Sequence, residues 1–205
     1  MELEKAIKQR TSIRTFKDKQ IPVEDLKKLV QMAGTAPSVN NYQPWKFYVI
    51  TNKRLMEKMA DLVKDKIEEI PENESKAADN IKHQVEWFAT FFENAPALIA
   101  MTMEEYESVL EKGVKMSHED INKMRNYPDI QSAGAAIQNI LLTAVDLGYG
   151  ACWMSAPMVA KDGLESLIEV EEPYHLVAFV AVGVPEKDMR PKEKKPLDQI
   201  FKLID

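Results

Sequence analysis

Three polar residues near the amino terminus, Arg10, Ser12 and Arg14, have the types and the spacing that suit an anion. We expect the stretch 10–16 to be extended, and alternate residues of an extended chain point to one side. Two guanidinium groups and a hydroxyl would then face the same ligand, and arginine can bind a phosphate through paired hydrogen bonds. Solvated surface arginines would show the same spacing, so the pattern alone leaves both interpretations open.

A loop over residues 36–44 carries a second group of polar side chains. From Pro37 to Trp45 the chain reads PSVNNYQPW, and so much proline, asparagine and serine argues against regular structure. Hydroxyl and amide groups beside aromatic rings suit a flat heteroaromatic ligand with amide-like groups along one edge. The alternative is an ordinary asparagine-rich turn before a strand.

A third group is the basic segment 190–196, RPKEKKP, in which four cations stand against one anion (4 − 1 = +3). The segment is either a solvated tail or it folds back to complete the anion site that begins at Arg10. The whole chain is acidic, because 27 Lys and Arg against 33 Asp and Glu give a net charge of −6. This balance disfavours nonspecific binding to nucleic acid, which depends on cations that neutralise phosphates.

Composition limits the other classes of function. The length of 205 residues suggests a single domain over 1–205, and 45% hydrophobic residues is enough for a sizeable core. No stretch approaches the ~20 apolar residues that span a bilayer, and the amino terminus lacks the apolar segment of a secretory signal. The lone Cys152 cannot form an internal disulfide. We therefore expect a cytoplasmic protein with no membrane or nucleic-acid partner.

Several common site patterns are missing from the sequence. The only G-x-G, at 148–150, is followed by Trp153 where a dinucleotide fingerprint needs its last glycine, and no G-K-S/T phosphate loop occurs. The histidines, His83, His118 and His175, are far apart in sequence, and we expect no metal site. Side chains would therefore have to hold a phosphorylated ligand, since no glycine loop is present to do so.

Hydrophobic periodicity predicts a mixture of helices and strands. The expected helices are 2–9, 23–33, 53–69, 130–147 and 160–169, and the expected strands are 46–51, 96–103, 149–154 and 174–184. Residues 70–94 are expected to form an excursion with one or two helices, and 104–128 a solvated, charged helical face. Helices and strands do not alternate strictly, which favours an α+β fold over a doubly wound sheet.

The order of these segments resembles that of the FMN-dependent nitroreductase family. The sequence RTSIR at 10–14 is similar to the family signature R-R-S-x-R, with Thr11 in place of the second arginine, and 37–45 fits P-S-x-x-N-x-Q-P-W. Residues 133–148 are similar to the central dimer helix, and 182–197 match the usual ending of the family. The resemblance covers nearly the whole chain and implies a central mixed or antiparallel sheet, flanked by helices, in an intertwined homodimer.

The family performs redox chemistry on a flavin, and the resemblance implies FMN as the cofactor and NAD(P)H as the co-substrate. In the family mechanism, NAD(P)H delivers hydride to flavin N5 and leaves. An electron-poor small-molecule acceptor, a nitroaromatic or a quinone, then takes its place and is reduced. Because the flavin makes the bonds, no catalytic side chain is expected. The alternatives are reductive dehalogenation or flavin fragmentation on the same fold, or a flavin-binding regulator or store without turnover.

The resemblance also implies which residues bind the cofactor. They are Arg10, Thr11, Ser12, Arg14, Pro37, Ser38, Asn41, Gln131, Met154, Ser155, Ala156, Lys192 and Lys194. Arg10 and Ser12 would hold the phosphate. A lysine of the tail, Lys192 or Lys194, would join them. Arg14 would reach the pyrimidine edge of the flavin.

The remaining contacts would come from both subunits, because FMN lies at the dimer interface in this family. Pro37, Ser38 and Asn41 would belong to the partner subunit and contact the ring and the ribityl chain. The resemblance implies that Gln131 would make a further polar contact to the ring. The backbone N–H of Ala156 would meet flavin N5, although this alanine and the preceding serine stand where some relatives have Glu-Gly.

Two segments fall outside this common plan. The variable excursion 70–128 is expected to cover the substrate side, and 186–205 is expected to form a carboxy-terminal arm. The excursion contains four aromatic residues, Trp87, Phe88, Phe91 and Phe92. They either line the acceptor pocket or pack between helices.

Overall fold

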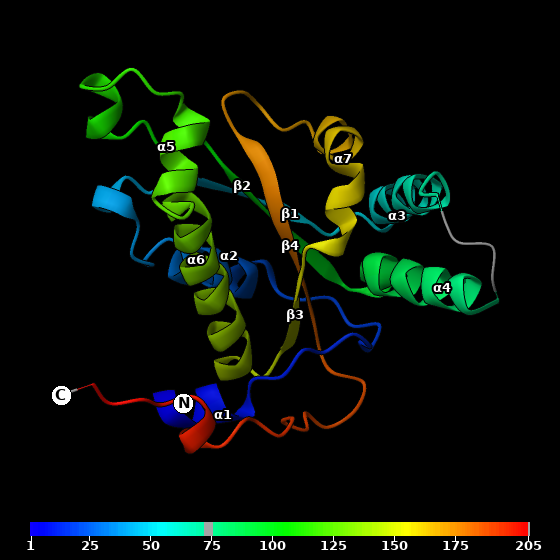
Figure 1. The fold of residues 1–205 in the computed structure, drawn as a ribbon. Helices are drawn as coiled ribbons and strands as arrows, with labels where there is room; N and C mark the ends of the chain where they lie inside the picture. Colours follow the sequence, from blue (N-terminus) through cyan, green and yellow to red (C-terminus); the bar gives the residue numbers. More distant parts are fainter. Residues whose placement is uncertain (72–75, 205) are drawn as a thin grey trace.

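The computed structural model describes residues 1–71 and 76–204 as an α+β fold (Figure 1). The helices are α1 (Leu3–Gln9), α2 (Val23–Ala33), α3 (Lys53–Glu68), α4 (Lys76–Thr90), α5 (His118–Met124), α6 (Pro128–Asp146) and α7 (Lys161–Leu167). The strands are β1 (Trp45–Ile50), β2 (Ala97–Met103), β3 (Gly150–Met154) and β4 (His175–Gly183). Short 3-10 helices are η1 (Val39–Asn41), η2 (Phe91–Asn94), η3 (Val109–Lys112), η4 (Ala156–Ala160) and η5 (Leu197–Gln199).

In the described residues the strands form an antiparallel sheet in the order β1-β2-β4-β3. The middle strands, β2 and β4, pair with Ala97 opposite Val182 and Ala100 opposite Phe179. Every residue of β2 is buried, which explains its unbroken apolar sequence, ALIAMTM, because a strand covered on both faces does not alternate. The predicted α+β class and the antiparallel sheet are confirmed.

Helices cover both faces of the sheet and enclose a core on each (Figure 1). On one face, α2 and α6 bury side chains such as Leu29 and Ile137 against Ile99 of β2. On the other face, α3, η2 and α7 bury Met59 and Phe92, among others. Since successive residues of a strand point to opposite faces, each central strand contributes to both cores. The sheet is thereby fixed between two helical layers.

The predicted elements agree with the structure to within a few residues except in the segment 104–128. That segment contains the short helices η3 and α5 instead of one long helical face, and Tyr106, Ser108 and Ile121 in it are buried. The expectation of one helical face is therefore wrong, whereas Glu105, Glu107, Lys112 and Lys115 of the charged cluster are exposed, as a solvated face requires. Among the described residues, no helix has the length and apolarity to cross a bilayer.

Candidate functional site

Both ends of the chain meet at the edge of the sheet formed by β3. Ser12 pairs in parallel with Ala151 of β3, and the N–H of Ile13 donates to the carbonyl of Ala151 at 3.0 Å. Farther on, Phe16 pairs with Pro185, just after β4. The amino-terminal stretch is thus extended, as predicted, and lies between β3 and the start of the carboxy-terminal arm.

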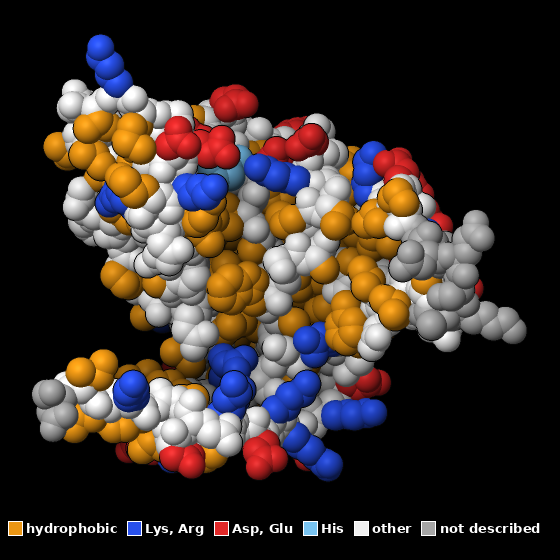
Figure 2. Space-filling view, viewed as in Figure 1, with side chains coloured by type: hydrophobic (Ala, Val, Ile, Leu, Met, Phe, Trp, Pro, Cys, Tyr) orange, Lys and Arg blue, Asp and Glu red, His pale blue; other side chains and the backbone are white. Residues whose placement is uncertain are grey.

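A hollow of about 640 Å³ opens where the two ends meet. Its lining residues are Thr11, Ser12, Ile13, Glu186, Lys187, Asp188, Arg190 and Lys192. Figure 2 shows Lys and Arg side chains gathered in this region, between the body of the molecule and the arm. Two hydroxyl groups and several cations suit a phosphate, which accepts hydrogen bonds and carries negative charge. The donor set therefore fits the phosphate of a nucleotide cofactor.

Arg10 and Arg14 lie beside the same strand as Ser12. Burial raises the pKa of the Cys152 thiol in β3, whereas the neighbouring Arg14, Ser12 and Arg10 act in the opposite direction. All three polar residues are therefore close enough to influence one buried atom. The structure brings together the first group that the sequence singled out.

The loop with Pro37, Ser38 and Asn41 is held far from this hollow within the same chain. Figure 1 shows η1 on one side of α6 and the amino-terminal stretch toward the other. The N–H of Val39 donates to Ser132 Oγ of α6 at 3.3 Å, and Ser38 Oγ accepts from the N–H of Gln43 at 3.0 Å. Within one chain, the loop and the arginines therefore lie on different sides of α6.

The other expected contacts are spread over the end of β3 and the start of α6. Gln131 is exposed, and its Nε2 donates to the carbonyl of Asn126 at 2.7 Å. Met154 is 3% exposed and its side chain belongs to the core beneath α3, so only its backbone is available to a ligand. Ser155 is exposed and Ala156 begins η4.

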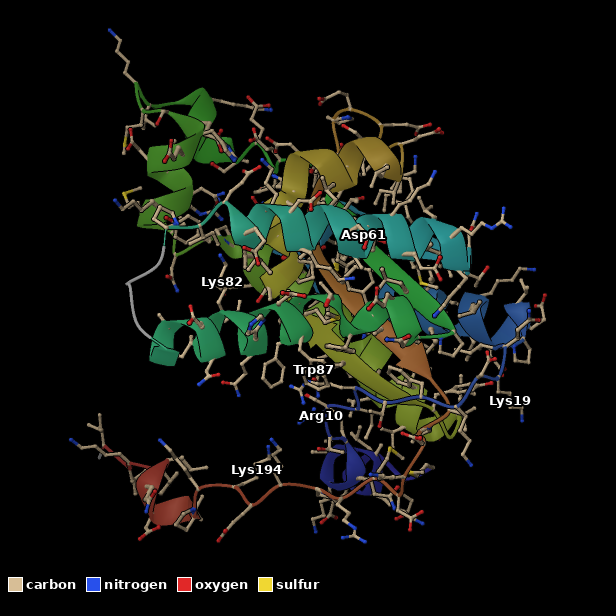
Figure 3. All side chains as sticks on the ribbon, turned by 90° about the vertical axis from the view of Figure 1, so that its right-hand side faces the viewer. Arg10, Lys19, Asp61, Lys82, Trp87 and Lys194 are labelled. Carbon is tan, nitrogen blue, oxygen red and sulfur yellow. The ribbon has the colours of Figure 1, made fainter. Side chains whose placement is uncertain are left out.

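The two expected lysines of the carboxy-terminal arm differ in their relation to the hollow. Lys192 lines the hollow, whereas Lys194 is not among its lining residues; Figure 3 shows Lys194 on the arm below Arg10. Arg190 lines the hollow as well, although the implied set of cofactor residues does not include it. The sequence signal for Arg190 was its place in the basic segment 190–196. In the part of the chain that the structure describes, no cluster of His, Cys, Asp or Glu could hold a metal ion.

Comparison with known proteins agrees with this arrangement. The model of the nitroreductase family matches residues 7–184. An iodotyrosine deiodinase from Hydra vulgaris is 29% identical over 202 residues, which covers 96% of this chain and 70% of the relative. A putative NADH dehydrogenase/NAD(P)H nitroreductase from Archaeoglobus fulgidus is 28% identical, over 90% of this chain and 87% of the relative.

Solved structures show the same fold. A BluB-like flavoprotein from Clostridium difficile 630 is 34% identical with a TM-score of 0.88, and the match covers 100% of both chains. A nitroreductase with bound FMN from Bacteroides fragilis shares the fold, with a TM-score of 0.73 and 22% identity over 100% of both chains. On the match over residues 7–184, this chain belongs to the nitroreductase family, whose members are oxidoreductases.

Proposed function

We propose that this protein binds FMN and transfers electrons from NAD(P)H to an electron-poor acceptor, either a nitroaromatic or a quinone. The observation that carries the proposal is the hollow between the chain ends, where Thr11 and Ser12 face Arg190 and Lys192. Family membership and the FMN in the Bacteroides fragilis relative support the same cofactor.

Each group in and beside the hollow has a role in this proposal. Ser12, Arg10 and Lys192 would hold the FMN phosphate, and Arg190 would add a further cation. Arg14 would supply a fixed positive charge to the flavin ring, and such charges tune the potential of a flavin. When bound, FMN would supply the hydride chemistry at N5, in separate half-reactions with NAD(P)H and the acceptor. The protein would bind and orient the reactants and needs no nucleophile.

The proposal includes a homodimer in which one domain, 1–205, places its arm, 186–205, on a second copy. Five apolar side chains of the arm are 61–84% exposed. They are Leu197, Ile200, Phe201, Leu203 and Ile204. Apolar surface of this kind gains free energy when a partner covers it. A second copy would also bring Pro37, Ser38 and Asn41 toward the flavin.

The test is the colour of the purified protein and its response to reduced nicotinamide. We expect a flavin absorption band at about 450 nm, which NADH or NADPH bleaches in the absence of oxygen. A colourless protein that takes up no FMN on reconstitution would contradict the proposal. Stopped-flow reduction separates an enzyme from a flavin store, because a store would bleach slowly or not at all.

Reductive dehalogenation is a second candidate, because several similar proteins are iodotyrosine deiodinases, among them the one from Hydra vulgaris. The pre-reduced protein should be offered a halotyrosine in one series and a nitroaromatic and a quinone in another. Release of halide from the first series, with slow turnover of the second, would replace the leading proposal by this one.

A further inference from the structure

The loop that is proposed to meet the partner's flavin has an unusual backbone. Asn40, Asn41 and Gln43 all have positive φ, at 50°, 55° and 55°. Residues other than glycine rarely adopt this left-handed conformation, and they keep it only where their surroundings impose it. The contacts that hold the loop therefore decide where Ser38 and Asn41 point.

One of these contacts comes from the variable excursion rather than from the family motifs. Tyr106 lies between β2 and η3 and is 7% exposed. Its hydroxyl accepts a hydrogen bond from Nδ2 of Asn40, and its ring meets the ring of Tyr42 edge to face, with centroids 5.1 Å apart. Tyr106 thus contacts the residue before Asn41 and the residue after it.

Neighbouring groups fix Tyr106 in turn. The N–H of Glu104 donates to the carbonyl of Pro44 at 2.9 Å, which ties the base of the loop to the end of β2. The guanidinium of Arg125 lies 5.9 Å from the centre of the Tyr106 ring. A buried phenol with contacts on several sides has little freedom to turn, so it can hold a flexible asparagine in place.

We propose that Tyr106 is a positioning residue for the cofactor, acting through Asn40 and Tyr42 on the loop that carries Ser38 and Asn41. The inference rests on the proposed function, because the loop would contact FMN bound to the other subunit. Without the hydroxyl, the Asn40 amide loses its acceptor. The remaining hydrogen bonds, which the N–H of Val39 donates to Ser132 Oγ and the N–H of Gln43 donates to Ser38 Oγ, keep the chain folded but leave the turn looser.

The experiment compares Tyr106→Phe with Tyr127→Phe in the full chain. Tyr127→Phe is the control, because it also removes a phenol hydroxyl from the excursion, but from a side chain that is 45% exposed. Amide hydrogen exchange is measured at Asn41 and Tyr42, whose N–H groups donate to the carbonyls of Ser38 and Val39. We expect exchange about tenfold faster at these amides in Tyr106→Phe alone, since opening of the turn controls their exposure. Unchanged exchange would overturn the inference.

Flavin binding supplies the second readout. We expect Tyr106→Phe to weaken FMN binding by about tenfold, in line with the loss of one hydrogen bond in a positioning chain, and to alter the visible absorption of the bound flavin. Tyr127→Phe should match the wild type in both. If FMN binds both variants as tightly as the wild type and with the same spectrum, Tyr106 does not position the cofactor.

A third variant, Asn40→Gly, removes the other partner of the hydrogen bond and keeps a residue that accepts positive φ. It should reproduce the faster exchange, and the double variant should add little to either single change. If Tyr106→Phe fails to fold, Asn40→Gly still tests whether the hydrogen bond between Tyr106 and Asn40 holds the loop. A wild-type protein that takes up no FMN would refute the proposed function, while the exchange data would still decide whether Tyr106 holds the loop.

Discussion

The guanidinium of Arg14 lies over the ring of Phe88, 5.1 Å from its centroid. A cation at this distance is attracted to the face of an aromatic ring. Arg14 belongs to the amino-terminal stretch beside the hollow, and Phe88 belongs to α4, in the excursion 70–128. The excursion therefore touches the candidate site directly.

The aromatic residues of this excursion divide into two kinds. Phe92 is fully buried and stacks on Phe179 at 5.9 Å, whereas Trp87 is 49% exposed, on the side of α4 that faces Arg10 in Figure 3. Phe92→Ala should cost ~3–5 kcal/mol in the free energy of unfolding, and Trp87→Ala no more than ~1 kcal/mol. Urea unfolding measures both.

The variant Trp87→Ala also tests whether Trp87 contacts the acceptor. Trp87→Ala should change kcat/KM for a nitroaromatic acceptor while the rate of reduction by NADH stays nearly the same. An unchanged kcat/KM for every acceptor tried would assign Trp87 to packing alone, together with Phe92.

Arg10→Ala should release FMN. A hydrogen bond to a charged group contributes ~1.5–3 kcal/mol, so the dissociation constant should rise by about tenfold to a hundredfold. Flavin fluorescence titration measures it. Arg54→Ala is the matched control, because Arg54 is an exposed arginine on α3 and its loss should leave binding unchanged. Equal affinities for the two variants would place the phosphate elsewhere.

Gly150→Ala should loosen the attachment of the amino-terminal stretch to β3. A Cβ at Gly150 would lie 2.7 Å from Cγ1 and 2.8 Å from Cβ of Ile13, so Ile13 and its backbone must move. Overpacking of this kind costs ~1–3 kcal/mol. Gly113→Ala is the control, since its Cβ would meet only the carbonyl of Leu110, at 3.8 Å. Thermal unfolding measures the stability of both variants. Equal losses of stability would show that Gly150 and Ile13 are not in close contact.

The pair formed by His118 and Glu111 should make stability depend on pH. The hydrogen bond between His118 Nδ1 and Glu111 Oε2, at 2.9 Å, raises the pKa of His118 above 6.5. A histidine with a raised pKa stabilises the fold fully below its unfolded value, and the stabilisation is lost as pH rises through the folded value. The wild type should therefore lose stability as pH rises from the ordinary histidine value of 6.5 through the raised pKa of His118.

In acid, Glu111 makes stability depend on pH in the opposite direction. The backbone N–H of Ser108, and then His118, lower the pKa of Glu111 from 4.5 to about 2. Its stabilisation is present above 4.5 and is lost as pH falls toward 2. His118→Gln should flatten the alkaline decline, whereas His83→Gln, at an exposed histidine of α4, should keep it. Urea unfolding at a series of pH values measures the slopes, and parallel slopes for all three proteins would argue against the pair.

Truncation after Pro185 should remove both the flavin and the dimer. The shortened chain lacks Arg190 and Lys192 and the exposed apolar side chains of the arm. Light scattering gives the mass of the particle, and the absorption spectrum gives its flavin content. A truncated protein that stays yellow and dimeric would show that the arm belongs to neither site nor interface.

Local patterns predicted most of the fold. The apolar spacing of Leu26 and Leu29 gave the buried face of α2, and the unbroken apolar sequences of β2 and β4 indicated the buried centre of the sheet. These predictions hold because helices and strands impose fixed periods on their buried positions. For the meeting of the chain ends, the charge of 190–196 gave only one of two alternatives, and the family resemblance favoured it, since pairing between distant segments leaves no periodic signal.

Local sequence patterns did not predict which residues of the excursion are buried. Burial of Tyr106 among charged neighbours depends on tertiary contacts with Asn40 and Tyr42 of the loop and with Arg125 after α5, and not on the composition of the segment. The side chain of Met154 likewise proved to be core, because the alternation of β3 turns it toward α3. In both cases the partner lies far away in sequence, so its position had to come from the structure.

The pairing of Ser12 with Ala151 and of Phe16 with Pro185 also has a consequence for biosynthesis. Arg10 and Arg14 leave the ribosome early, and the arm with Arg190 and Lys192 leaves last. A nascent or prematurely terminated polypeptide thus displays only one side of the hollow and cannot close it. If the hollow binds FMN as proposed, the cofactor would bind only after translation is nearly complete.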